Sequence, residues 1–214
     1  MYESTEAIEQ SLQPTKAWFR KNVQPLWEKY LKPLAPFSCY LEIGVFEGES
    51  LLWAAKNLLG DYGTAEGVDP WIAKNVGPQQ KNRIREARNI AFARCHEFNE
   101  SEIYNRADRK IYLEELESYE FFLSYLSDIG KTYDIIYIDG DHLAPAALCD
   151  MVLAWRVLEK GGIFIVDDIH IRKGSRPFRT VPHTGEAWDA FAICHEGQFE
   201  EIYKSEMQVA VRKL

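Results

Sequence analysis

Five residues capable of acid–base or metal chemistry stand at the ends of two apolar segments. Asp139, Asp141 and His142 directly follow one segment, and Asp167 and Asp168 end another. If these segments are neighbouring strands, the carboxylates of Asp139, Asp167 and Asp168 converge, and their repulsion raises a pKa unless a cation lies between them. Such oxygen ligands suit Mg²⁺, or Mn²⁺ or Ca²⁺ in its place. The sequence therefore predicts a metal site of three carboxylates. The alternative is that Asp167 and Asp168 only cap a turn.

A second group of residues lies at a strand-to-helix turn. The strand-like run 39–43 contains Glu42, and Gly44 and Gly48 follow it. Glycine allows a tight turn and a close approach of ligand, and the N-terminus of the next helix offers free N–H groups. A dinucleotide site needs a third glycine, and Glu42 would repel a diphosphate. The turn thus favours a ligand with positive charge; the alternative for Glu42 is a strand end without a ligand.

This turn resembles motif I of the class I S-adenosylmethionine-dependent methyltransferases, and three further segments match in register. They are Gly67-Val68-Asp69-Pro70, the acidic run 139–142, and the run 161–168. Together they resemble the small family that contains macrocin O-methyltransferase, and more distantly the catechol and caffeoyl-coenzyme A O-methyltransferases. The resemblance covers residues 36–214, with specific motifs at these four points.

The resemblance implies S-adenosylmethionine as the cofactor and suggests roles for individual residues. Asp69 would accept both ribose hydroxyls, Ser50 would bond the methionine carboxylate, and Ser118 would mark the adenine edge. As alternatives, Ser50 and Ser118 are helix N-caps and Asp69 is a turn residue before a proline. The predicted cofactor-binding residues are Glu42, Gly44, Gly48, Ser50, Asp69, Ser118 and Asp139.

The general base has two candidates. Catechol-type enzymes carry a lysine base at the position that matches His142, and a histidine can accept a proton near pH 7. Asp141 is the competing base, because macrocin-type relatives share the Asp-Gly-Asp run that it ends. Many metal-dependent relatives have Asn where this chain has Asp168, so the implied Mg²⁺ site carries extra negative charge here. His142 as a turn residue is the alternative.

Alternating patterns position these residues on an α/β fold. Apolar runs predict strands near 39–43, 64–68, 109–113, 133–138 and 162–167. Helices are predicted near 48–59, 78–95, 117–128 and 144–158. Such alternation gives parallel strands. The tail predicts a hairpin, 199–203 with 207–212, which the resemblance makes the antiparallel end of a Rossmann-like seven-stranded sheet with helices on both faces. Residues 1–35 are predicted as a helical lead-in, kinked at Pro25, and 36–214 as the methyltransferase domain.

Composition supports an acidic globular enzyme of 214 residues. The net charge of −8 argues against a nucleic-acid partner that relies on general electrostatics. No run reaches the ~18 apolar residues of a membrane span, so no membrane association is predicted. The four cysteines are widely spaced and the start lacks an apolar leader, which favours a cytoplasmic location. A homo-oligomer is left open.

The predicted activity is methylation of a small-molecule hydroxyl, on a sugar or phenolic ring, with metal assistance. The segment 169–184 carries Arg172, Lys173, Arg176 and Arg179 beyond a strand end, which would suit an anionic acceptor; a solvated loop is the alternative. Metal-free N- or O-methylation is the rival activity. A non-catalytic cofactor-binding module is the rival from another class.

Overall fold

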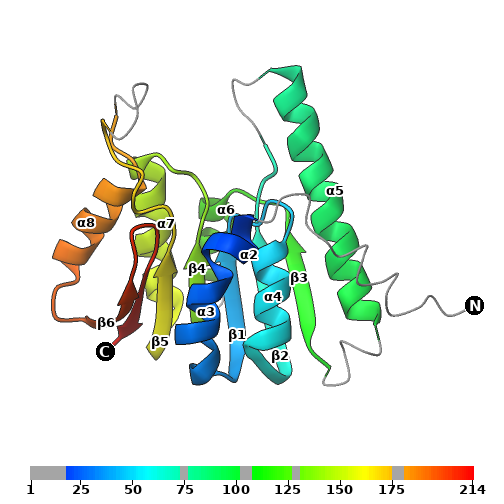
Figure 1. The fold of residues 1–214 in the computed structure, drawn as a ribbon, viewed down its shortest axis with the longest axis horizontal. Helices are drawn as coiled ribbons and strands as arrows, with labels where there is room; N and C mark the ends of the chain where they lie inside the picture. Colours follow the sequence, from blue (N-terminus) through cyan, green and yellow to red (C-terminus); the bar gives the residue numbers. More distant parts are fainter. Residues whose placement is uncertain (1–17, 73–76, 102–107, 127–130, 175–180) are drawn as a thin grey trace, which may run out of the picture.

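The computed structural model describes residues 18–72, 77–101, 108–126, 131–174 and 181–214, and its centre is one seven-stranded sheet (Figure 1). The strand order is β3-β2-β1-β4-β5-β7-β6. The first five strands are parallel, and β7 runs antiparallel to both β5 and β6. The predicted Rossmann-like sheet with a C-terminal antiparallel hairpin is confirmed. The strands are β1 Phe37–Ile43, β2 Leu59–Val68, β3 Lys110–Glu114, β4 Tyr133–Ile138, β5 Leu158–Val166, β6 Phe199–Lys204 and β7 Val209–Lys213.

Helices cover both faces of this sheet. One apolar core holds side chains of α2, α3, α4 and α5, and the other holds side chains of α6, α7 and α8. In Figure 1, α3 and α4 cross the front of the sheet and α7 lies behind it. The central strands are buried on both faces, as expected for parallel strands with helical crossovers. The helices that follow the first strands are α4 Glu49–Asn57, α5 Pro78–Glu100, α6 Ser118–Leu126 and α7 Ala144–Val157.

The strand register brings four carboxyl ends to one level. Ile43 at the end of β1 pairs with Val68 of β2 and with Ile138 of β4. Ile138 in turn pairs with Val166 of β5. The residues after these four positions therefore meet at one edge of the sheet, where ligands of open α/β folds bind.

The N-terminal lead-in forms helices that pack on the first core. They are α2 Trp18–Asn22, α3 Gln24–Tyr30 and the short 3₁₀ helix η1 Lys32–Leu34. Pro25 lies in the first turn of α3, where its missing N–H costs no helical bond. The predicted kink thus appears as a break between two helices. Phe19 and Trp27 are buried, so aromatic side chains of these helices pack in the core. Residues 1–17 lie outside the described residues.

The sequence reasoning missed α8, which spans Thr184–Cys194. Ala187, Trp188 and Phe191 bury one face of this helix at three- and four-residue spacing, so the periodic pattern was present. Its N-terminus has a capping box in which the His183 backbone N–H donates to Glu186 Oε2 at 3.0 Å.

Among the described residues, no helix is long and apolar enough to cross a membrane.

We expect Phe191→Ala to destabilise the fold by about 3–5 kcal/mol, the usual cost of truncating a fully buried aromatic side chain. The Phe191 ring is buried against Trp155, Phe164 and His195. Ile193 lies on the same helix with 75% of its surface exposed, so Ile193→Ala should change stability by less than ~0.5 kcal/mol. Urea unfolding of both variants measures the difference. Equal losses would show that α8 does not pack on the sheet.

Candidate functional site

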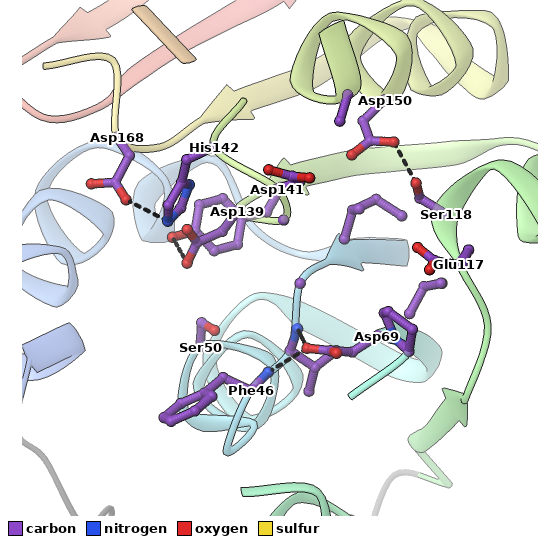
Figure 2. Close-up of a pocket in the computed structure, with 18 of the residues that line it drawn as sticks. Phe46, Ser50, Asp69, Glu117, Ser118, Asp139, Asp141, His142, Asp150 and Asp168 are labelled. Atoms are coloured by element: carbon purple, nitrogen blue, oxygen red, sulfur yellow. Dashed lines mark hydrogen bonds and ion pairs between the residues drawn. The ribbon is translucent and has the colours of Figure 1, made fainter. Parts of the chain in front are cut away.

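A cavity of about 1040 Å³ lies over the carboxyl ends of the strands. Its volume is at the upper end of the ~300–1,000 Å³ typical of ligand pockets, which leaves room for two reactants. Figure 2 shows its walls, with the acid cluster at one end and Asp69 and Ser118 towards the other. The predicted site residues that line the cavity are Gly44, Ser50, Asp69, Ser118, Asp139, Asp141, His142 and Asp168.

Glu42 lies beneath the cavity wall rather than in it. Its side chain is fully buried, and its two carboxylate oxygens accept hydrogen bonds from Ser50 Oγ and Tyr40 Oη, each at 2.6 Å. Burial raises the Glu42 pKa to about 8, although both hydrogen bonds lower it. Glu42 therefore acts on the cavity through Ser50, whose hydroxyl it orients.

The turn after β1 requires glycine. Gly44 has φ of +90°, and a Cβ there would overlap the carbonyl oxygen of Asp139 on the neighbouring strand. Gly48 has φ of +76° and is the N-cap residue of α4. Gly48 does not itself line the cavity, so its role is to start α4 at the site.

Asp69 supports the turn from the end of β2. Its Oδ2 accepts from the backbone N–H of Val45 and Phe46, both at 2.9 Å, and its Oδ1 accepts from Trp71 N at 2.7 Å. Burial raises the Asp69 pKa, and these three bonds oppose that rise. Oδ1 keeps a free lone pair, because a carboxylate oxygen can accept two bonds. Asp69 thus fixes the turn and can still receive a hydroxyl of a ligand.

Ser118 has a partner that the sequence reasoning missed. Its hydroxyl donates to Asp150 Oδ1 on α7, and both residues line the cavity (Figure 2). Burial raises the Asp150 pKa to about 6. The signal available in the sequence was an acid within the apolar helix 144–158. Ser118 is the first residue of α6, and its hydroxyl bonds Asp150 rather than capping the helix, so the alternative of an N-cap is wrong. Its position at the adenine edge stays a prediction.

The acid cluster brings together Asp139, His142 and Asp168. Each offers one ligand atom, and these atoms lie within 4.8 Å of one another. His142 Nε2 is 3.2 Å from Asp168 Oδ2, and His170 Nδ1 is 3.5 Å from Asp168 Oδ1. Asp168 has φ of +54°, which turns its side chain towards these imidazoles. Burial, followed by repulsion from Asp167 and Asp168, raises the Asp139 pKa.

Asp167, the third predicted metal ligand, does not line the cavity. Only 1% of its surface is exposed, and its Oδ2 accepts a 2.6 Å hydrogen bond from Tyr137 Oη. The strand ends at Val166, and the positive φ of Asp168 turns the chain there, so Asp167 and Asp168 separate. Tyr137 Oη also lies 3.2 Å from Asp139 Oδ2 and joins the two acids. The structure thus groups two of the three predicted ligands with His142 and sets Asp167 behind them.

The competing base and the cations predicted to bind the acceptor complete the set of candidate site residues. Asp141 Oδ1 accepts from the backbone N–H of Leu143 at 2.9 Å, which is a local turn contact, although Asp141 also lines the cavity. Arg172 pairs with both carboxylate oxygens of Asp189 on α8. Residues 175–180, with two of the predicted acceptor-binding arginines, lie outside the described residues. Among the described lining residues, Arg83 is the only arginine or lysine.

Comparison with known proteins identifies the family. The sequence profile of a family of methyltransferase domains matches residues 41–169, more than half of the chain. The chain belongs to this family, and its fold and motifs are those of class I S-adenosylmethionine-dependent methyltransferases, as the resemblance implied. No curated protein matches the sequence significantly.

Solved structures share the fold at low sequence identity. An O-methyltransferase from Bacillus cereus in complex with SAH is 18% identical over 100% of this chain and 93% of its own, with a TM-score of 0.62. The N-methyltransferase NodS from Bradyrhizobium japonicum, also with SAH, is 14% identical over 97% of each chain, with a TM-score of 0.56. The MycE methyltransferase of the mycinamycin biosynthetic pathway, with Mg and SAH, is 15% identical over 98% of this chain and 54% of its own, with a TM-score of 0.58.

We expect the stability of the protein to fall as the pH rises, in part because of Glu42. Its pKa is about 8 in the folded protein and 4.5 in its ordinary state, so the folded chain binds the extra proton between these values. The stabilisation is therefore complete below pH ~4.5 and is lost as the pH approaches 8. Urea unfolding at pH 5 and pH 8 should show a smaller decline for Glu42→Gln than for wild type. Glu206→Gln, in the exposed hairpin loop, is the control; identical profiles for all three proteins would exclude the Glu42 contribution.

Proposed function

We propose that the protein transfers a methyl group from S-adenosylmethionine to a hydroxyl of a small molecule. The observation that supports this most is the convergence of four family motifs on one cavity large enough for two reactants. The acid cluster lies at one end of the cavity and would face the acceptor. The turn after β1 lies apart from this end and would hold the cofactor. A non-catalytic binding module would have no need of such a cluster.

The cofactor would lie along the strand ends, from Ser50 to Ser118. When bound, S-adenosylmethionine supplies a sulfonium methyl group that an acceptor oxygen attacks in line. Ser50 would contact the methionine end, Asp69 Oδ1 would receive ribose hydroxyls, and Ser118 would lie at the adenine edge. The cationic ligand suits a turn with buried carboxylates beneath it.

The donor set at the acid cluster fits a divalent cation. Asp139 and Asp168 provide carboxylate oxygens within 4.8 Å of each other, and burial, with repulsion from Asp167 and Asp168, raises the Asp139 pKa. We propose that these two residues would hold Mg²⁺, with Asp167 behind them. A bound Mg²⁺ would supply Lewis acidity that lowers the pKa of an acceptor hydroxyl.

His142 is the proposed general base. Asp168 lies 3.2 Å from its Nε2, an arrangement that orients the imidazole. His142 is exposed to the cavity, so it can take the acceptor proton at the free nitrogen or after a small rotation of the ring. Asp141 remains the competitor, but its Oδ1 is occupied by the turn.

Metal-free transfer to oxygen or nitrogen is the second candidate. It is favoured by the position of His142, because His142 stands in the cluster where a third carboxylate was expected. In that case the His142–Asp168 pair would form the entire proton-accepting unit.

S-Adenosylmethionine and S-adenosylhomocysteine should bind, and Asp69→Ala should weaken both by about 1.5–3 kcal/mol, the usual loss for charge-assisted hydrogen bonds. Asp69→Asn keeps one acceptor oxygen and should lose less. Isothermal titration calorimetry measures the three affinities. No heat and no thermal shift of the wild type with either compound at millimolar concentration would refute the proposed cofactor.

His142→Ala should reduce kcat by about 10², near the lower end for removal of a general base, and should leave the affinity for S-adenosylhomocysteine little changed. The matched variant is Asp141→Asn, which retains an oxygen for the Leu143 N–H and should keep most of the activity. Acceptors found by screening hydroxylated sugars and phenols with radiolabelled S-adenosylmethionine provide the assay. The opposite pattern, with turnover abolished only in Asp141→Asn, would assign the base to Asp141.

A further inference from the structure

A buried polar network runs beneath the acid cluster and reaches both the N-terminal helices and the C-terminal hairpin. We define this Gln208 network by Trp27, Tyr203, Gln208, Asp167 and Tyr137. Gln208 is fully buried at the start of β7, and its Oε1 accepts hydrogen bonds from Trp27 Nε1 at 2.8 Å and from Tyr203 Oη. Trp27 also packs edge-on against Tyr137, with ring centroids 5.0 Å apart.

The two donors determine which way the amide of Gln208 faces. An indole N–H can only donate, so the amide oxygen must face Trp27 and Nε2 must point elsewhere. Among the described residues, neither Gln208 Nε2 nor Asp167 Oδ1 has a hydrogen-bond partner, and both atoms are buried. Burial raises the Asp167 pKa to about 6, and Gln208 is one of the groups close enough to oppose that rise. A buried donor and a buried acceptor that both lack a partner are complementary.

The hairpin holds Gln208 rigidly in this place. Ser205 N donates to Gln208 O at 2.8 Å, and Gln208 N donates to Ser205 Oγ at 2.9 Å. Ile169 N donates to Met207 O at 2.9 Å, which ties the segment after Asp168 to the same hairpin. Gln208 is therefore fixed relative to the strand end that carries the acid cluster.

We propose that Gln208 is a positioning residue for the acid cluster. Its amide, oriented by Trp27 and Tyr203, donates from Nε2 to Asp167 Oδ1. Asp167 then fixes the Tyr137 hydroxyl, which shares its one hydrogen between Asp167 at 2.6 Å and Asp139 at 3.2 Å and so holds the Asp139 carboxylate in place. This inference rests on the proposed function, in which Asp139 is a metal ligand. Groups that orient metal ligands from behind typically change metal affinity 10–100-fold when they are mutated.

The test uses Mn²⁺ as the probe, on the full chain saturated with S-adenosylhomocysteine. Gln208→Met keeps the length of the side chain and removes both polar ends. Electron paramagnetic resonance titration should show Mn²⁺ binding 10–100-fold weaker than in wild type. Calorimetry should show the affinity for S-adenosylhomocysteine unchanged within about twofold, because Ser50 bonds Glu42 and Asp69 bonds the turn after β1, rather than any member of the network.

A second set of variants tests the orientation of the amide. Trp27→Phe and Tyr203→Phe each leave one donor to Gln208 Oε1, so each alone should weaken Mn²⁺ binding less than the double variant. The double variant frees the amide to turn over and should approach Gln208→Met. This set also decides the matter if Gln208→Met does not fold.

Val211→Ala is the matched control for stability. It lies on the same strand but packs in the opposite core, so it should destabilise the fold without altering Mn²⁺ affinity. If Gln208→Met and the double variant bind Mn²⁺ as tightly as wild type, Gln208 only packs and the proposal is overturned. If wild type binds S-adenosylhomocysteine but no Mn²⁺, the proposed metal and this inference both fail, and the methyltransferase assignment stands.

Discussion

The site depends on the parallel register of β1 with β2 and β4. Because Ile43 is level with Val68 and Ile138, the residues that follow three strands are brought together by backbone hydrogen bonds before any side chain contributes. The spacing is close enough that only glycine fits at position 44, against the carbonyl of Asp139. Helices then cover the faces of the sheet but leave this edge open.

The same register concentrates carboxylates in a region with little water. Neutral hydroxyl groups bond to them. Tyr40 and Ser50 donate to Glu42, and Ser118 donates to Asp150. Tyr137 donates to Asp167 and lies 3.2 Å from Asp139. A hydroxyl satisfies an acceptor without adding a counter-charge. These acids are thus held in place without a fixed counter-charge, which leaves room for a sulfonium cofactor and, in the proposed mechanism, a divalent cation. Arginines pair instead with Glu47 and Glu49 at the cavity wall near α4, and with Asp189 on α8.

The sequence predicts most of this arrangement because it depends on strand ends. The apolar runs locate all five parallel strands, and the position of Asp69, Asp139 and Asp168 follows from where those runs stop. The sequence does not predict as well in which direction a side chain points once the strand has ended. Asp167 and Asp168 are adjacent and chemically identical, and only the positive φ of Asp168 separates a cavity residue from a buried one. Asp150 was missed because its burial depends on the packing of α7 beside α6, a tertiary contact.

The two walls of the cavity are therefore formed by different structural elements. The cofactor wall comes from strand ends and the turn at Gly44, which the sheet fixes. The opposite wall, proposed to hold the acceptor, combines this edge with added elements. Trp18 of α2 lines the cavity and is 42% exposed, and Phe46 lines it with a φ of +50°. A left-handed conformation is unfavourable for a bulky residue, and such strain is concentrated at binding sites. In the proposed function, the exposed ring of Trp18 would contact the acceptor, while Phe46, whose backbone N–H bonds Asp69, would border both walls.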